Sequence, residues 1–291
     1  MKLHHGELDI TGDLVRRLLA AQFPAWAGLP LTPVASGTEN LMIRLGEDMV
    51  VRLPRMPGAV TAIRKEHRWL PFLAPRVPLE VPVPLGLGSP GPDFPLPWAI
   101  YRWLPGRHDI TDLPAAAAAL GGFVAALHKA DPAGAPAAYR GGSYVTRDGE
   151  VRAELRDLAG GACGGVDLAA AAARWEAALR LPAWDGPPVW LHSDLLPPNL
   201  LGRGGALAAV IDFGCAGVGD PAADLMAAWT VFDAASRPIF RDAVGDVDDD
   251  TWERGRAWAL VFGLGAWHYY RRRKPDFAAL GRRTVNQTLT P

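Results

Sequence analysis

Four polar residues at fixed spacing, which lie beside short apolar segments, constrain this chain more than any other feature of its sequence. His192 and Asp194 form a His-x-Asp pair, and Asn199 follows five residues after the aspartate. An Asp-Phe-Gly sequence (212–214) comes directly after the apolar run 208–211. Short apolar runs between polar or Gly-rich turns are typical of short strands that carry loops. The sequence therefore predicts that these polar groups lie on neighbouring loops.

A carboxylate, an amide and a second carboxylate at this spacing suit phosphoryl transfer. That reaction leaves little covalent work to the protein, so catalysis consists of positioning the acceptor and neutralising charge. We predict that Asp194 is catalytic and orients the acceptor hydroxyl, and that Asn199 and Asp212 bind Mg²⁺. A His-x-Asp with a following Asn is weak evidence by itself, and the Asp-Phe-Gly on a predicted strand makes the pattern strong.

On these residues the chain resembles the aminoglycoside phosphotransferase family, which comprises small-molecule antibiotic kinases with the two-lobed fold of protein kinases. The sequence Asp-Pro-Ala-Ala-Asp-Leu (220–225) is similar to that family's Asp-Pro-x-x-Asp-Leu and is lacking in protein kinases. Ser193 stands where protein kinases have the arginine that reads activation-loop phosphorylation, and the span 214–220 leaves no room for such a loop. The resemblance implies a constitutively active enzyme. It continues upstream through residues 50–55, 65–70 and 101–106 and so covers most of the chain.

The resemblance also implies structural roles for several polar residues. His192 is expected to be buried behind Asp194 without a chemical role. Asp220 and Asp224 are expected to cap a helix and to brace the catalytic loop, rather than to bind magnesium.

Apolar periodicity and the resemblance together indicate an α+β, two-lobed, protein-kinase-like fold. We predict a small β-rich N-lobe over residues 1–103, an antiparallel sheet with a crossing helix that covers the nucleotide. The larger, mainly α C-lobe, residues 104–291, would hold the catalytic loop, the metal site and the substrate-binding helices, after a break at Pro105-Gly106. The predicted strands are 31–34, 41–45, 49–53, 81–87, 98–104, 189–191, 199–201 and 208–211, and the predicted helices are 11–21, 59–73, 115–129 and 166–181.

The resemblance assigns Arg52 and Glu66 to the phosphates of ATP. Most relatives have a lysine at the position of Arg52, and the sequence Arg-Leu-Pro-Arg (52–55) is similar to the Arg-x-Pro-Arg of macrolide-type members. An arginine stays charged and can bind phosphate oxygens bidentately. Glu66 would pair with Arg52 and orient it. The alternatives are an edge-strand charge for Arg52 and an exposed helix carboxylate for Glu66.

Other nucleotide contacts are implied by family position. Ser36 and Gly37 would cover the phosphates, although an ordinary hairpin turn predicts the same residues. Backbone groups of Arg102 and Leu104 would meet the adenine edge. Val51 and Ile211 would be its apolar walls, while Tyr101 and Trp103 are expected to be core.

The charge balance excludes some classes of partner. Thirty Lys and Arg against 31 Asp and Glu give a net charge of −1, which argues against binding nucleic acid or an anionic membrane surface. Two cysteines are too few for a disulfide framework, and residues 1–10 have no apolar run typical of a signal peptide. The longest uncharged run near the C-terminus, 257–270, is too short to span a bilayer. We expect a cytoplasmic protein, monomeric or homodimeric, with a small-molecule substrate.

Charge is uneven along the chain. Residues 185–250 contain eleven acidic residues against three arginines, which is compatible with a cationic substrate. A solvated acidic loop at 246–250 explains the excess equally well. Aromatic residues within 252–270 could form an apolar substrate wall, or simply belong to a buried helix.

The predicted function is ATP- and Mg²⁺-dependent transfer of the γ-phosphate to a hydroxyl of a small molecule, with an aminoglycoside or macrolide antibiotic as the first expectation. Two rivals remain open at this point. One is a metabolic kinase for an amino alcohol, a fructosamine or a sugar, and the other is a nucleotide-binding pseudokinase without turnover.

Overall fold

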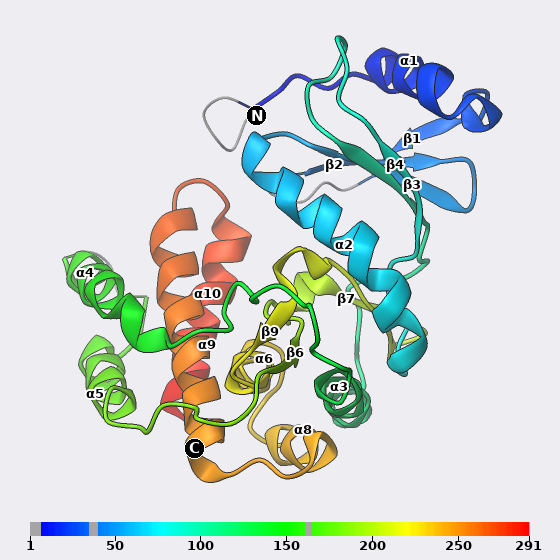
Figure 1. Cartoon of the computed structure of the whole chain (residues 1–291). Helices are drawn as coiled ribbons and strands as arrows, with labels where there is room; N and C mark the ends of the chain where they lie inside the picture. The colour runs from blue at the N-terminus through cyan, green and yellow to red at the C-terminus, as the bar shows by residue number, and fades with distance from the viewer. Residues whose placement is uncertain (1–6, 35–39, 161–163, 291) are drawn as a thin grey trace. The chain divides into compact units, whose positions relative to one another are not determined.

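A computed structural model describes residues 7–34, 40–160 and 164–290 (Figure 1). Contacts within the chain divide it into two compact units. Unit 1 contains the described residues up to Arg76, together with Glu80–Pro105 and Ala209–Gly214. Unit 2 contains Val77–Leu79, Gly106–Ala208 and the chain from Cys215 onward. The predicted boundary of the functional lobes, between residues 103 and 104, stays a prediction.

Unit 1 is built on a five-stranded sheet in the order β1-β2-β3-β5-β4, in which every neighbouring pair is antiparallel. β2 and β3 form a hairpin that turns at Gly46, whose φ of 61° is a conformation that glycine adopts without strain. Segment 209–214 joins this unit because the Val210 N–H donates to the Glu80 carbonyl. The strands are β1 (Leu31–Pro33), β2 (Asn40–Leu45), β3 (Met49–Pro54), β4 (Pro84–Gly88) and β5 (Trp98–Arg102).

Two helices cover opposite faces of this sheet, α1 (Gly12–Gln22) and α2 (Val60–Leu73) (Figure 1). Successive residues of a strand point to opposite faces, so β3 directs Val51 and Leu53 into the core under α1. Arg52 points the other way, toward α2. This alternation places a charged side chain on the buried face of a central strand.

Unit 2 is mainly helical, so the predicted α+β composition is confirmed. Its longest helix, α9, packs along α10, and a Cβ at Gly281 would lie 2.6 Å from the Gly263 carbonyl oxygen. The helix axes can approach this closely only because both residues lack side chains. The helices are α3 (Leu113–His128), α4 (Asp148–Ala159), α5 (Leu168–Ala178), α6 (Ala222–Leu225), α7 (Ala227–Thr230), α8 (Arg237–Val244), α9 (Asp249–Tyr270) and α10 (Pro275–Leu289).

Two small sheets bracket the polar loops. β6 (Val189–Leu191) pairs antiparallel with β9 (Gly217–Gly219), and β7 (Leu200–Arg203) neighbours β8 (Ala206–Val210). The predicted short strands are therefore present. Short 3₁₀ turns complete the chain at Pro24–Trp26, Pro57–Ala59, Ala74–Arg76, Tyr144–Arg147, Pro197–Asn199 and Phe213–Cys215.

The aromatic residues of α9 are divided between core and surface. Trp258 and Trp267 are buried, as the buried-helix alternative expected, whereas Tyr269 is exposed. Within the described ranges, no helix combines the length and apolarity needed to cross a membrane.

Helix α4 lies against α9 and half-buries a carboxyl group between them. A Cβ at Gly265 of α9 would lie 3.4 Å from Oε1 of Glu154. Burial raises the pKa of Glu154 from 4.5 to about 7, repulsion from Glu150 adds to the shift, and Arg147 opposes it. Because the folded chain holds this proton more tightly than the unfolded chain, stability falls as the pH rises from about 4.5 to about 7.

We therefore predict that Glu154→Gln raises the melting temperature at pH 8 and has little effect near pH 4.5. The amide stays neutral, so it avoids the cost of a buried charge at high pH. Thermal melts at the two pH values measure the difference. Glu47→Gln, at an exposed turn, is the control and should have no effect at either pH. An equal effect of Glu154→Gln at both pH values would contradict this account.

Candidate active site

The centre of unit 1 is an arginine that bridges two carboxylates. Nη1 of Arg52 donates to Oε1 and Oε2 of Glu66 at 2.9 and 2.8 Å, and Nη2 pairs with Oδ1 of Asp212 at 3.1 Å. Arg52 is 8% exposed and Glu66 is 1% exposed. The predicted pair is thus present and buried. Both alternatives are wrong, because β3 lies between β2 and β5 and Glu66 is not exposed.

A third group completes this network. Tyr101 on β5 donates its hydroxyl to Oε2 of Glu66 at 2.6 Å. The sequence predicts Tyr101 as a core residue and assigns it no hydrogen bond. The signal that could have found it is general: a buried tyrosine hydroxyl needs a hydrogen-bond partner, and β5 is the neighbour of β3.

The network sets the charge states of its members. Burial disfavours the charged guanidinium, but Glu66 and Asp212 more than offset this and raise the pKa of Arg52. Burial raises the pKa of Glu66, while Arg52 opposes that shift. Burial and Glu66 also raise the pKa of Tyr101 well above its ordinary value, so its hydroxyl keeps its proton and donates. The guanidinium is therefore a fixed positive charge.

Asp212 differs from Glu66 in its access to solvent. Its side chain is 48% exposed, so its carboxylate can reach a ligand while it stays paired with Arg52. Phe213 is buried, and a Cβ at Gly214 would lie 2.8 Å from Cβ of Ala62 on α2. The Asp-Phe-Gly sequence therefore packs closely on α2 and presents its aspartate outward.

In unit 2 the loop after β6 is held by a buried aspartate. The carboxylate of Asp224 accepts the N–H groups of His192 and Ser193 at 2.9 and 2.7 Å, and all three residues are fully buried. The Asp194 N–H donates to Nδ1 of His192 at 3.2 Å. The expected bracing by Asp224 and the expected structural place of His192 are both present.

Asp194 and Asn199 lie together in this loop. Nδ2 of Asn199 donates to the Asp194 carbonyl at 2.9 Å and to Oδ2 of the same residue at 3.0 Å. The other oxygen, Oδ1, accepts from Nη1 of Arg140 at 2.7 Å. Arg140, which lies 54 residues before Asp194, is not among the site residues predicted from the sequence.

Backbone strain marks both loops. Ser193 and Asp212, with φ of 67° and 64°, are the non-glycine residues with positive φ in the described chain. Such conformations cost about 1–3 kcal/mol each and cluster at functional sites, where the surrounding structure holds them in place. One lies directly before Asp194 and the other is itself a predicted magnesium ligand.

The residues predicted for the adenine have mixed outcomes. The prediction that Val51 contacts the adenine is wrong, because Val51 is fully buried under α1, on the face of the sheet opposite to Arg52. The Arg102 N–H donates to the Val83 carbonyl, so only Leu104 of the two backbone residues could supply an N–H to a base. Ile211 is partly buried beside Asp212. Ser36 and Gly37 lie outside the described residues.

Many of the acidic residues of 185–250 have structural partners. The N-cap of α6 is Pro221 and not Asp220, but Asp220 accepts the Ala222 N–H at 2.9 Å and also pairs with the buried Arg254 at 2.9 Å. These carboxylates thus stabilise helices and loops, which leaves fewer acidic residues for a cationic substrate. Further acidic residues with such partners include Asp233 with the Ser236 N–H, Asp248 with the Thr251 N–H and Asp249 with Arg241.

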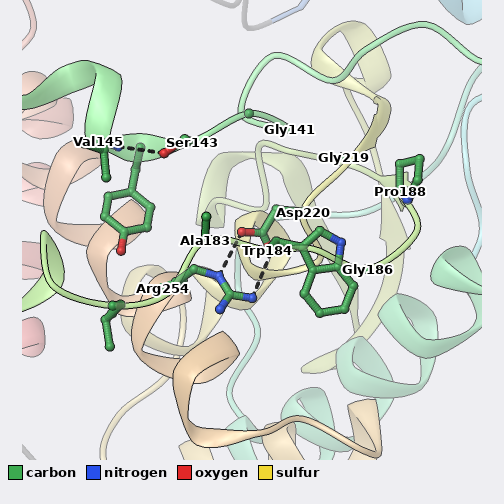
Figure 2. Close-up of a pocket in the computed structure, with 13 residues that line it drawn as sticks. Gly141, Ser143, Val145, Ala183, Trp184, Gly186, Pro188, Gly219, Asp220 and Arg254 are labelled. Atoms are coloured by element: carbon green, nitrogen blue, oxygen red, sulfur yellow. Dashed lines mark hydrogen bonds and ion pairs between the residues drawn. The ribbon is translucent and has the colours of Figure 1, made fainter.

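A pocket of about 270 Å³ lies within unit 2, and Asp194 is not among its lining residues. Figure 2 shows Arg254 and Asp220 paired at its wall, beside the ring of Trp184. Both charged groups have partners within the protein, so the pocket offers a ligand mainly its apolar surface.

Each of the two predicted magnesium ligands has an oxygen atom suited to that ion. The amide nitrogen of Asn199 donates to Asp194, so its amide oxygen can bind a cation. Asp212 has a solvent-accessible carboxylate. Mg²⁺ prefers oxygen ligands and commonly takes one or two carboxylates, with substrate phosphates completing its shell. Among the described residues, no cluster of three or more His, Cys, Asp or Glu could hold a metal ion.

Comparisons with known proteins place this geometry in context. A model of the phosphotransferase enzyme family matches residues 30–258. No curated protein matches. Among solved structures, the aminoglycoside phosphotransferase APH(2")-IIIa, in complex with GDP and kanamycin, has 19% sequence identity to this chain and a TM-score of 0.71. The match covers 94% of this chain and 97% of that one. The apoenzyme of macrolide 2'-phosphotransferase MphH from Brachybacterium faecium is 25% identical with a TM-score of 0.60, over the same shares.

We predict that Tyr101→Phe destabilises the protein by about 1–3 kcal/mol, because the buried carboxylate of Glu66 loses a hydrogen bond. Urea unfolding measures the change. Tyr139→Phe is the matched control, since Tyr139 is exposed and the same atom is removed there. Equal stability of the two variants would show that the Tyr101 hydroxyl does not hold Glu66.

Proposed function

The chain belongs to the phosphotransferase enzyme family, and on that premise we propose that it transfers the γ-phosphate of ATP, with Mg²⁺, to a hydroxyl of a small molecule. The observation that carries the proposal is the pair of Asp194 and Asn199, held in one braced loop by Asp224. A carboxylate of this kind can orient a hydroxyl before any proton moves.

Each residue has a distinct role in this proposal. Asp194 accepts a hydrogen bond from the acceptor hydroxyl and takes its proton late, as the new oxygen–phosphorus bond forms and the bond to the ADP oxygen breaks. Oδ1 of Asn199 and the carboxylate of Asp212 hold Mg²⁺, which when bound would neutralise charge on the phosphates. Arg52 binds the α- and β-phosphates, oriented by Glu66. Leu104 and Ile211 contact the adenine.

The substrate class is proposed from the relatives and from charge. The solved relatives include an aminoglycoside phosphotransferase with kanamycin and two macrolide 2'-phosphotransferases. We propose an antibiotic of one of these classes as the acceptor and the cytoplasm as the place of reaction. The structural use of the acidic residues favours the macrolide, which carries fewer amino groups than an aminoglycoside.

A panel of acceptors tests the proposal. The protein would be incubated with Mg²⁺ and either ATP or GTP, together with kanamycin, gentamicin, erythromycin, choline, a fructosamine or a simple sugar. Nucleoside diphosphate release and ³¹P NMR of the product identify the acceptor. Transfer to an antibiotic supports the proposal, while transfer to choline, the fructosamine or the sugar alone supports the metabolic alternative. Nucleotide binding without transfer to any acceptor would indicate a pseudokinase.

For the acceptor so identified, we predict that Asp194→Ala lowers kcat at least about a hundredfold, because both positioning and proton acceptance are lost. Affinity for Mg²⁺-ATP, measured by calorimetry, should change little. Asp185→Ala, the same change at an exposed residue of unit 2, serves as the control for kcat. Near-normal turnover of Asp194→Ala would refute the assigned role.

A further inference from the structure

Arg140 lies in the segment between α3 and the 3₁₀ turn Tyr144–Arg147, and it contacts the catalytic loop at three points. Its backbone N–H donates to Oγ of Ser193 at 2.7 Å. Its Nη1 donates to the Ser193 carbonyl at 2.6 Å and to Oδ1 of Asp194 at 2.7 Å. One residue thus binds the backbone, the hydroxyl and the carboxylate of two consecutive loop residues.

We propose that Arg140 is a positioning residue for phosphoryl transfer, which fixes the carboxylate of Asp194 in the orientation that receives the acceptor hydroxyl. The inference rests on the role proposed for Asp194. Arg140 acts through Asp194, and no contact of Arg140 with substrate is needed.

The geometry around Asp194 supports this role. Oδ1 is bound by Arg140 and Oδ2 by Asn199, so the two oxygens are held from two directions. Rotation of the carboxylate would break both contacts. Since a misplacement of about 1 Å can cost a hundredfold in rate, a carboxylate held at both oxygens gains directly from these contacts.

Arg140 is itself held rigidly. It is mostly buried, with a side chain 13% exposed, and its guanidinium lies 5.0 Å from the ring centre of Tyr139 and 5.9 Å from that of Phe262 on α9. The neighbouring backbone is anchored as well, because the Tyr139 N–H donates to the Cys215 carbonyl and a Cβ at Gly141 would lie 2.6 Å from the Val218 carbonyl oxygen. The guanidinium is therefore in place before any ligand binds.

The neighbouring loop residue is suited to this arrangement. Ser193 is fully buried at a φ of 67°, a conformation that costs free energy unless its surroundings hold it. Arg140 binds both its hydroxyl and its carbonyl, and Asp224 binds its N–H. Arg140 thus stabilises the strained residue that directs Asp194.

The test compares Arg140→Gln with Arg140→Lys. Glutamine removes the charge, and its amide nitrogen lies two bonds closer to the backbone than Nη1 of arginine. A lysine side chain keeps the charge, is only one bond shorter, and has donors for both the Ser193 carbonyl and Oδ1 of Asp194. Turnover and KM for Mg²⁺-ATP would be measured below the melting temperature of each variant, with the acceptor found in the panel, or with water as acceptor in an ATP hydrolysis assay. Nucleotide-free crystal structures of both variants would record the carboxylate of Asp194.

We expect Arg140→Gln to lower kcat at least about tenfold with KM for ATP within about twofold of the native value, because positioning affects the reacting groups and not nucleotide binding. Arg140→Lys should recover a large part of kcat. In the Arg140→Gln crystal structure the carboxylate should rotate away from Asn199. Arg256→Gln is the control, because it also removes a buried guanidinium, which donates to the Thr288 carbonyl and has no contact with Asp194 in the described structure. It should lower the melting temperature and leave kcat unchanged.

Several results would overturn the inference. Unchanged or higher turnover of Arg140→Gln would show that Arg140 is dispensable or that it blocks the site. A lysine variant no better than glutamine, or a rise in KM that accounts for the whole loss, would indicate a structural role alone. If the native protein transfers phosphate to no acceptor and not to water, the proposed function fails, and the position of the Asp194 carboxylate in the crystal structures then decides the inference.

Discussion

A carboxylate that is buried away from water needs hydrogen-bond donors or a positive charge beside it. The buried carboxylates of the site all have such partners. Without such partners, burial of a charge costs many kcal/mol. Glu66 is met by Arg52 and Tyr101, Asp224 by the backbone N–H groups of His192 and Ser193, and Asp194 by Arg140 and Asn199. In each case the donors that satisfy the charge also fix its direction. The groups assigned to catalysis are therefore oriented before a ligand arrives, which is how preorganised sites lower a barrier.

The same requirement links stability to function. Removing one partner of a buried ion pair typically costs about 3–5 kcal/mol, because the other charge is left without compensation. Arg52 bridges Glu66 with Asp212, two carboxylates 146 positions apart in the chain, so it ties α2 to the segment that follows β8. The exposed half of Asp212 is then the part of this network that stays accessible to a ligand. In Asp212, therefore, one carboxylate oxygen pairs with Arg52, and the exposed part of the same side chain is accessible to a ligand.

The parts of the site that depend on residues close together in the sequence could be predicted. The contacts between residues far apart in the sequence could not. Arg52 and Glu66 are 14 residues apart within one strand–helix unit, and their predicted pairing is present. Asp194 and Asn199 are five residues apart within one loop, where the structure shows them in contact. Arg140 and Tyr101 reach partners 54 and 35 residues away, and only the folded chain brings them together. Because only four of the 30 basic residues are lysines, a single arginine is inconspicuous in this sequence. Val51 was misassigned because both faces of β3 are buried, so apolar residues do not reveal which face they occupy.

We propose that Asp194, Asn199 and Asp212 act on one magnesium nucleotide. A crystal structure with a non-hydrolysable ATP analogue and Mn²⁺ in place of Mg²⁺ tests this most directly, because the anomalous signal of manganese locates the metal. The account predicts a manganese peak ligated by the amide oxygen of Asn199 and the carboxylate of Asp212, with the terminal phosphate facing Asp194 and Arg52 on the inner phosphates. A manganese peak away from both ligands, or an Asp194 carboxylate directed away from the terminal phosphate, would contradict it.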